Sequence, residues 1–205
     1  MGFGLLFIGY MFMFSFPYRG LDILPDIIGF IISYIGIRSL SEYGCGFDDL
    51  KKYYSVLLPA SFLTFVLQLL QFFGVGIGIL EVWNYIYTAF IMLFNILLLI
   101  AIYKISNDTD LKSIMAKAKR NLIITFIYFG MTLILNLPLS FIVRFKTFLT
   151  TKYALGFAMF VFGYCWLILN LLLIYNCYMW ICKPGDEDMP MPEKRSVLKH
   201  KEEED

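Results

Sequence analysis

Histidine is almost absent from this chain. The single His200 lies in the charged C-terminal segment, which excludes a histidine-based metal site or catalytic triad from the rest of the sequence. No Walker A, H-E-x-x-H or G-x-S-x-G motif is present, and the four cysteines, Cys45, Cys165, Cys177 and Cys182, lack the spacing of a metal site. The sequence therefore predicts a non-enzymatic protein with no catalytic residues, no metal and no cofactor.

Charged residues are also few. They make up 16% of the 205 residues, whereas 60% are hydrophobic and the mean hydropathy is +0.72. Soluble domains contain about 45–50% apolar residues, and a domain of this size cannot bury so much apolar surface. This composition excludes intrinsic disorder, a secreted disulfide scaffold and a nucleic-acid-binding domain for the body of the chain. It requires a lipid bilayer as solvent.

Six apolar segments are candidates for membrane spans. They cover about residues 2–16, 24–40, 54–73, 82–103, 121–143 and 153–180. A complete span needs about 20 residues, and the first segment reaches only about 22 Å at 1.5 Å per residue. The first two segments therefore have an alternative, a short re-entrant hairpin that leaves four complete spans. The main prediction is an all-α, polytopic integral membrane protein with six transmembrane helices over residues 1–182.

Lysine and arginine are distributed unevenly among the connections. Thirteen lie in the second and fourth connections and the C-terminal segment, and four lie in the other connections. Because basic loops stay on the cytoplasmic side, both termini are predicted to be cytoplasmic, which agrees with an even number of spans. Within the fourth connection, residues 107–120 predict either a short amphipathic helix at the membrane surface or a cytoplasmic extension of the fifth span.

Residues 183–205 differ from the rest of the chain. They are rich in charge, contain Pro190 and Pro192, and close with three glutamates and an aspartate. Because such a segment cannot bury enough apolar surface to fold alone, it predicts a disordered cytoplasmic tail or a docking segment for a protein partner. The lipid bilayer is the other predicted partner. Nucleic acid is not expected, and a homo-oligomer is compatible with the sequence.

Arg19, Asp22 and Asp26 form the strongest candidate constellation for a ligand. They lie between the first two apolar segments, at the outer membrane boundary. One interpretation is a cation or proton site with Arg19 as the counter-charge, because carboxylates near lipid require a partner. The other is structural, with Asp22 as a helix cap and Asp26 beside the positive helix end, each worth about 0.5–1 kcal/mol. The same helix face continues through small residues that permit close helix packing, Gly29, Ser33 and Gly36.

Three asparagines are further candidates for polar or ion contact. Asn95, Asn136 and Asn170 fall within the fourth, fifth and sixth apolar segments. They can converge on one polar cavity, or each can form a single interhelical hydrogen bond worth about 0.6 kcal/mol. Both alternatives remain open from the sequence.

One short motif carries a resemblance. Residues 22–32, D-I-L-P-D-I-I-G-F-I-I, resemble a D-x-L-P-D-x-I-G signature near the N-terminus of small multi-pass membrane proteins of Gram-positive bacteria. The resemblance implies a bacterial cytoplasmic membrane and brings no activity with it. The leading hypothesis is a non-enzymatic accessory or scaffold protein that acts through helix packing, its cytoplasmic connections and its tail. The alternative is a small transporter or channel component, with Asp22 and Asp26 at an outer entrance and the three asparagines along the path.

Overall fold

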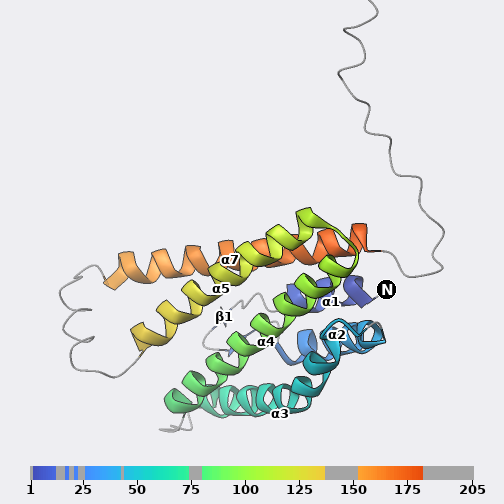
Figure 1. Cartoon of the computed structure of the whole chain (residues 1–205). Helices are drawn as coiled ribbons and strands as arrows, with labels where there is room; N and C mark the ends of the chain where they lie inside the picture. Colours follow the sequence, from blue (N-terminus) through green and yellow to red (C-terminus); the bar gives the residue numbers. More distant parts are fainter. Residues whose placement is uncertain are drawn as a thin grey trace, which may run out of the picture.

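Helices make up nearly all of the described structure (Figure 1). A computed structural model describes residues 2–12, 17–18, 21–22, 26–42, 44–73, 80–136 and 152–181. Its elements, in chain order, are α1 (Gly2–Met11), β1 (Pro17–Tyr18), β2 (Leu21–Asp22), α2 (Asp26–Ser41), α3 (Phe47–Phe72), α4 (Leu80–Asp108), α5 (Lys112–Asn136) and α7 (Lys152–Trp180). The two strands pair in antiparallel register, Pro17 with Asp22 and Tyr18 with Leu21. The predicted all-α class is confirmed for these residues, since each of the six apolar segments contains a helix.

The helices differ in whether they can cross a bilayer. By length and composition, three described helices can do so, over Phe47–Phe72 of α3, Val82–Asp108 of α4 and Phe157–Trp180 of α7. The 10 residues of α1 extend about 15 Å, half of a hydrocarbon core of about 30 Å. Six complete spans are therefore not confirmed by the described residues. The short α1 has the length expected of the re-entrant alternative.

The segment before the fifth apolar run belongs to α5. This helix runs without interruption from Lys112 to Asn136, so residues 112–120 continue the helix of the fifth apolar segment, as the second alternative predicts, whereas Asn107 and Asp108 end α4. Ile114 and Ala118 on this extension are buried against the bundle, whereas Lys112 and Lys119 are exposed. The contact of this apolar face with the bundle stabilises the part of α5 that precedes the fifth apolar segment.

Small residues bring α1 and α2 into backbone contact. A Cβ atom on Gly9 would lie 2.6 Å from the carbonyl oxygen of Gly29 and would collide with the hydroxyl of Ser33. A Cβ atom on Gly36 would lie 2.7 Å from the carbonyl oxygen of Gly2. Since glycine has no Cβ, the two helices can approach this closely. The predicted stripe of small residues on α2 is therefore the surface that packs against α1.

Three aromatic rings fill the space between α2, α3 and α4. Phe30, Tyr54 and Phe94 are fully buried, and each pair meets edge to face with ring centroids 5.5–6.2 Å apart. Edge-to-face contact places the positive ring edge against a negative ring face, which adds to the energy gained from apolar burial. This cluster fixes α2 against the two long helices.

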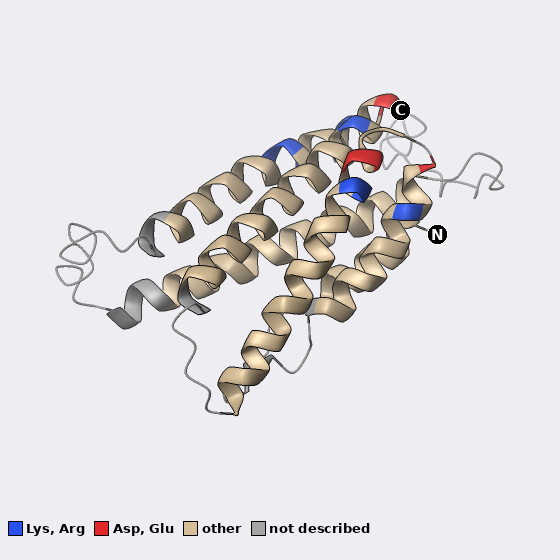
Figure 2. Cartoon of the chain, turned by 90° about the horizontal axis from the view of Figure 1, so that it is seen from below, with Lys and Arg blue, Asp and Glu red and all other residues tan. Residues whose placement is uncertain are grey.

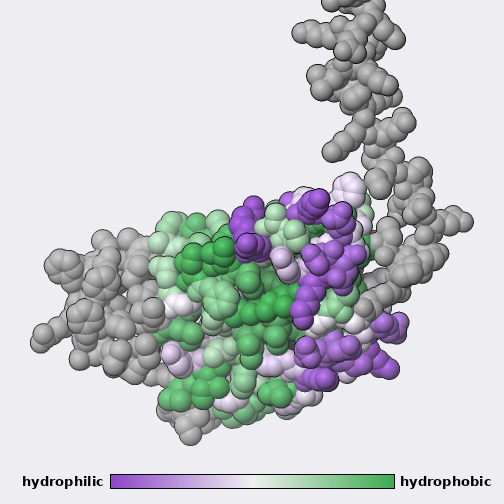
Figure 3. All heavy atoms as spheres, viewed as in Figure 1, coloured by the Kyte–Doolittle hydropathy of each residue, from purple (hydrophilic) through white to green (hydrophobic). Residues whose placement is uncertain are grey.

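The described charged residues lie toward one end of the bundle (Figure 2). We call this the charged end. It contains the end of α2, the start of α3, the end of α4 and the start of α5, and α1 begins and α7 ends there as well. The opposite end, where α3 and α5 finish and α4 and α7 begin, is called the far end. Apolar side chains dominate the surface between them (Figure 3), and many are exposed, among them Ile31, Phe62, Leu93, Ile127 and Leu172. This distribution is that of a membrane protein.

The turn from α2 to α3 is held to the end of α4 at the charged end. Gly44, Cys45 and Gly46 have φ angles of 71°, 50° and 88°. Positive φ costs conformational free energy for a residue other than glycine, here Cys45. The Cys45 thiol donates a hydrogen bond to Asp108 Oδ2 at 3.1 Å. Burial, this hydrogen bond and the Asp108 charge raise the pKa of the Cys45 thiol, and Lys104 opposes them.

Candidate functional site

A buried tyrosine joins three helices in the middle of the bundle. Tyr10, at the end of α1, donates a hydrogen bond from its hydroxyl to Asn95 Oδ1 on α4 at 2.6 Å. The Tyr10 hydroxyl oxygen in turn accepts a hydrogen bond from Asn170 Nδ2 on α7 at 3.1 Å. All three side chains are at least 98% buried. Two of the predicted asparagines, Asn95 and Asn170, are therefore joined through Tyr10, which was not among the predicted site residues.

These contacts continue toward the charged end. Asn121 Nδ2 on α5 donates to Asn170 Oδ1 at 3.0 Å, and Arg120 donates through Nε and a terminal nitrogen to Asn121 Oδ1 at 3.4 and 3.3 Å. Side chains thus connect the middle of the bundle with its charged end. We call this set the polar network, and its members are Asn95, Tyr10, Asn170, Asn121 and Arg120.

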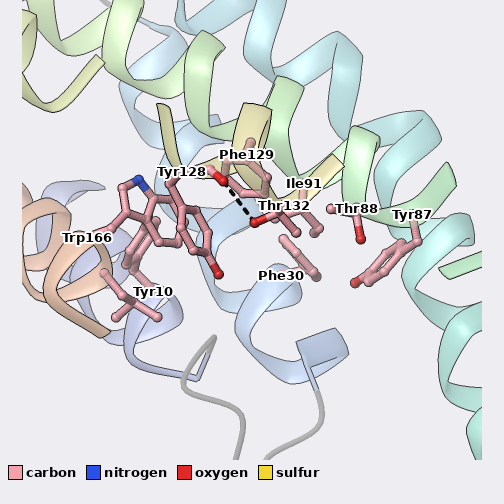
Figure 4. A pocket seen from close by; sticks show the side chains of 10 residues that line it. Tyr10, Phe30, Tyr87, Thr88, Ile91, Tyr128, Phe129, Thr132 and Trp166 are labelled. Atoms are coloured by element: carbon pink, nitrogen blue, oxygen red, sulfur yellow. Dashed lines mark hydrogen bonds between the residues drawn. The ribbon is translucent and has the colours of Figure 1, made fainter. Parts of the chain in front are cut away.

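A ligand-sized cavity lies beside the polar network, between α1, α2, α4, α5 and α7 (Figure 4). Its volume is about 300 Å³. Six of its ten described lining residues are aromatic, and Tyr10 belongs both to this lining and to the polar network. We call it the aromatic cavity after these rings, Tyr10, Phe30, Tyr87, Tyr128, Phe129 and Trp166.

Hydrogen bonds and ring contacts hold the rings on the α5 and α7 side. The rings of Tyr128 and Trp166 are stacked, with centroids 5.0 Å apart and an interplanar angle of 17°. Phe129 meets Trp166 edge to face at 5.2 Å. The Trp166 indole nitrogen donates to Thr125 Oγ1 at 2.8 Å, so the ring has one preferred position. A Cβ atom on Gly163 would lie 2.9 Å from the Tyr128 hydroxyl, so only glycine leaves room for that ring.

The remaining four lining residues are Thr88, Ile91, Thr132 and Leu167. Both threonine hydroxyls donate to backbone carbonyls one turn earlier, Thr88 to Asn84 and Thr132 to Tyr128, each at 2.8 Å. A hydroxyl has one proton and two lone pairs, so these groups keep acceptor capacity after donating. None of the described residues that line the cavity is charged.

Comparison of the chain with protein-family models, with curated proteins and with solved structures finds no match. Function is therefore inferred from the geometry.

The structure does not describe the side chains of the other four predicted site residues. Arg19 lies outside the described residues. Asp22 forms part of β2, Asp26 begins α2 and Asn136 ends α5, and only their backbone is described. The predicted cation site therefore stays a prediction. The place of Asn136 in the predicted convergence likewise stays a prediction. Within the described ranges, no group of three His, Cys, Asp or Glu side chains is placed to hold a metal ion.

Sequence reasoning missed Tyr10, Asn121 and the rings of the cavity. One feature of the sequence points to two of these residues, Tyr10 and Trp166. A tyrosine or tryptophan inside an apolar segment has a polar atom that must find a hydrogen-bond partner when buried, which makes Tyr10 and Trp166 natural companions of the mid-segment asparagines.

Proposed function

We propose that the protein is a small transporter or channel component of a bacterial cytoplasmic membrane, and that the aromatic cavity holds its solute. The single observation that carries the proposal is this half-open cavity of about 300 Å³ between the helices in the apolar part of the bundle. Protein interiors are otherwise close-packed, and ligand sites are concave spaces from about 300 Å³ upward, lined by apolar and aromatic side chains with a few polar groups. The aromatic cavity has these properties.

The depth of the cavity favours transport over a surface function. Tyr10 lies near the end of α1, about 12 Å along the helix from Gly2 at the charged end, and Thr88 lies about 30 Å before Asp108 along α4. The cavity thus occupies the middle and the far half of the bundle. The polar network lies between the cavity and the charged end, because Asn95, Asn121 and Asn170 are nearer than the lining residues to the charged ends of α4, α5 and α7.

The topology of the proposal follows from the basic residues. The charged end is assigned to the cytoplasm, because the Lys- and Arg-rich connections lie there. The cavity then lies toward the outer side. Asp26 begins α2 one helical turn before the cavity residue Phe30, and in this proposal Asp22 and Asp26 form the outer entrance. The accessory or scaffold hypothesis rests on helix packing, the cytoplasmic connections and the tail, and it gives no role to the cavity, so the cavity favours transport.

Osmotic swelling of proteoliposomes tests the proposal. Vesicles with the full chain are placed in glycerol, glycine or choline thiocyanate, whose anion crosses the bilayer and balances the charge of choline, and swelling is followed by light scattering. At least one solute should enter faster than into protein-free vesicles. Leu167→Trp, which fills the cavity, should abolish this entry. Leu172→Trp is the matched control, because Leu172 lies on the same helix and is 52% exposed on the apolar surface. Equal swelling of both variants, or of proteoliposomes and protein-free vesicles, contradicts the proposal.

A further inference from the structure

The aromatic cavity is lined by electron-rich groups, and we infer that its ligand is a small organic ammonium ion. This inference rests on the proposed function, because it names the class of solute that the cavity holds. Two independent features of the lining lead to it, the aromatic rings and the hydrogen-bonding state of the hydroxyl groups.

The rings supply the first feature. The face of an aromatic ring carries a negative potential that attracts a cation within about 6 Å of the ring centre, and tryptophan does so most strongly. Six rings line this cavity, including Tyr128 and Trp166, whose stacked arrangement and hydrogen bond fix their positions. Quaternary ammonium groups are the ligands that such groups of rings bind in other proteins.

The hydroxyl groups supply the second feature. The hydroxyls of Thr88 and Thr132 donate their protons to backbone carbonyls, and the Tyr10 hydroxyl donates its proton to Asn95. The two threonine oxygens can therefore only accept a hydrogen bond or face a positive charge. The Tyr10 oxygen is already an acceptor for Asn170. The lining thus matches a ligand that has positive charge or N–H and O–H donors.

The same features exclude other ligand classes. An anion would face the negative faces of the aromatic rings, with no cationic side chain among the described lining residues. A hydrocarbon chain would bury the Thr88 oxygen without a donor for its lone pairs, which costs free energy. A hydrated metal ion requires several oxygen ligands, commonly carboxylates, and none of the described lining residues has a carboxylate. A cavity of about 300 Å³ suits a small ion better than a whole lipid.

Binding of choline and of its neutral isostere, 3,3-dimethylbutan-1-ol, tests the inference on the purified full chain. The two molecules share shape and hydroxyl group and differ in charge. Isothermal titration should give an affinity for choline about tenfold higher or more. Choline should also raise the Tm, whereas the isostere should not. Equal affinities, tighter binding of the isostere, or no binding of either choline or tetraethylammonium overturns the inference.

Paired variants connect this preference with the cavity. Tyr128→Leu removes a ring and should weaken choline binding about fivefold or more, whereas Tyr128→Phe keeps the ring and should change it less than twofold. The double variant Thr88→Val with Thr132→Val keeps the side-chain shape and removes both acceptors, and it should also weaken choline binding. If Tyr128→Leu does not fold, this double variant tests the inference in its place. Unchanged choline affinity in the folded variants overturns the inference.

The two proposals can fail separately. If another solute enters the proteoliposomes, Leu167→Trp blocks it and no ammonium ion binds, the transport function stands and the ligand class is wrong. If choline binds as expected but Leu167→Trp leaves all solute entry unchanged, the cavity is a binding site and transport through it is wrong.

Discussion

The half of the bundle near the charged end and the half near the far end are held together in different ways. Near the charged end, α1 is present, its glycines contact the α2 backbone and Tyr10 connects it to α4 and α7. In the far half, α1 has ended at Met11, and the aromatic cavity lies beyond its last turn. The comparison teaches that the short α1 has two effects. It completes the packing of one half, and its last turn contributes Tyr10 to the lining of the cavity in the other.

The largest expected effect comes from the glycine contacts between α1 and α2. Gly9→Ala places a methyl group within 2.6 Å of the Gly29 carbonyl, and we expect a loss of about 3 kcal/mol in the free energy of unfolding, as for severe overpacking. Unfolding by sodium dodecyl sulfate, followed by circular dichroism, measures this loss.

Gly130→Ala on α5 is the matched control for this substitution. A Cβ atom on Gly130 would meet nothing within 4 Å, so alanine should leave stability unchanged or raise it by about 0.5–1 kcal/mol. If both alanine variants behave alike, close backbone contact does not hold α1 in place.

A smaller effect is expected where Tyr10 joins the polar network. Tyr10→Phe keeps the ring in the cavity lining but leaves Asn95 Oδ1 and Asn170 Nδ2 without this partner. The cost of unpaired buried groups predicts a loss of about 1–2 kcal/mol. Tyr175→Phe, at a position on α7 that is 45% exposed, should change the Tm by much less. Equal Tm values for the two variants would show that the network adds no stability.

The sequence predicts some of these features and not others, for physical reasons. The stripe Gly29, Ser33 and Gly36 was predictable because helix periodicity alone places these residues on one face. The link between Asn95 and Asn170 through Tyr10 depends on how α1, α4 and α7 are arranged in space, which no local sequence pattern encodes. The role of Tyr10 depends on where α1 ends, at Met11 instead of near Phe16 as predicted. The cavity is a space that side chains leave unfilled, and its lining comes from five helices.

The smallest effect concerns chemistry at the charged end and leaves stability nearly unchanged. Since the pKa of Cys45 is raised, its thiolate, the reactive form, is scarce at pH 8. Asp108→Asn removes the neighbouring negative charge, which should lower the pKa and speed alkylation by iodoacetamide about twofold to fivefold at this pH. The measurement is the pH profile of the rate in a variant whose only cysteine is Cys45. A profile that does not shift toward lower pH would show that the carboxylate of Asp108 does not control this thiol.

The central claim is that the aromatic cavity is reached by water and solutes from the side opposite to the charged end. Thiol accessibility at Thr132→Cys, in a background without the four native cysteines, tests it most directly. The small, membrane-impermeant reagent methanethiosulfonate ethyltrimethylammonium is added to intact cells. Thr132→Cys should react from outside and be protected by choline, whereas Leu172→Cys on the apolar surface should not react. No reaction at Thr132→Cys, or reaction only in inverted vesicles, would contradict the claim.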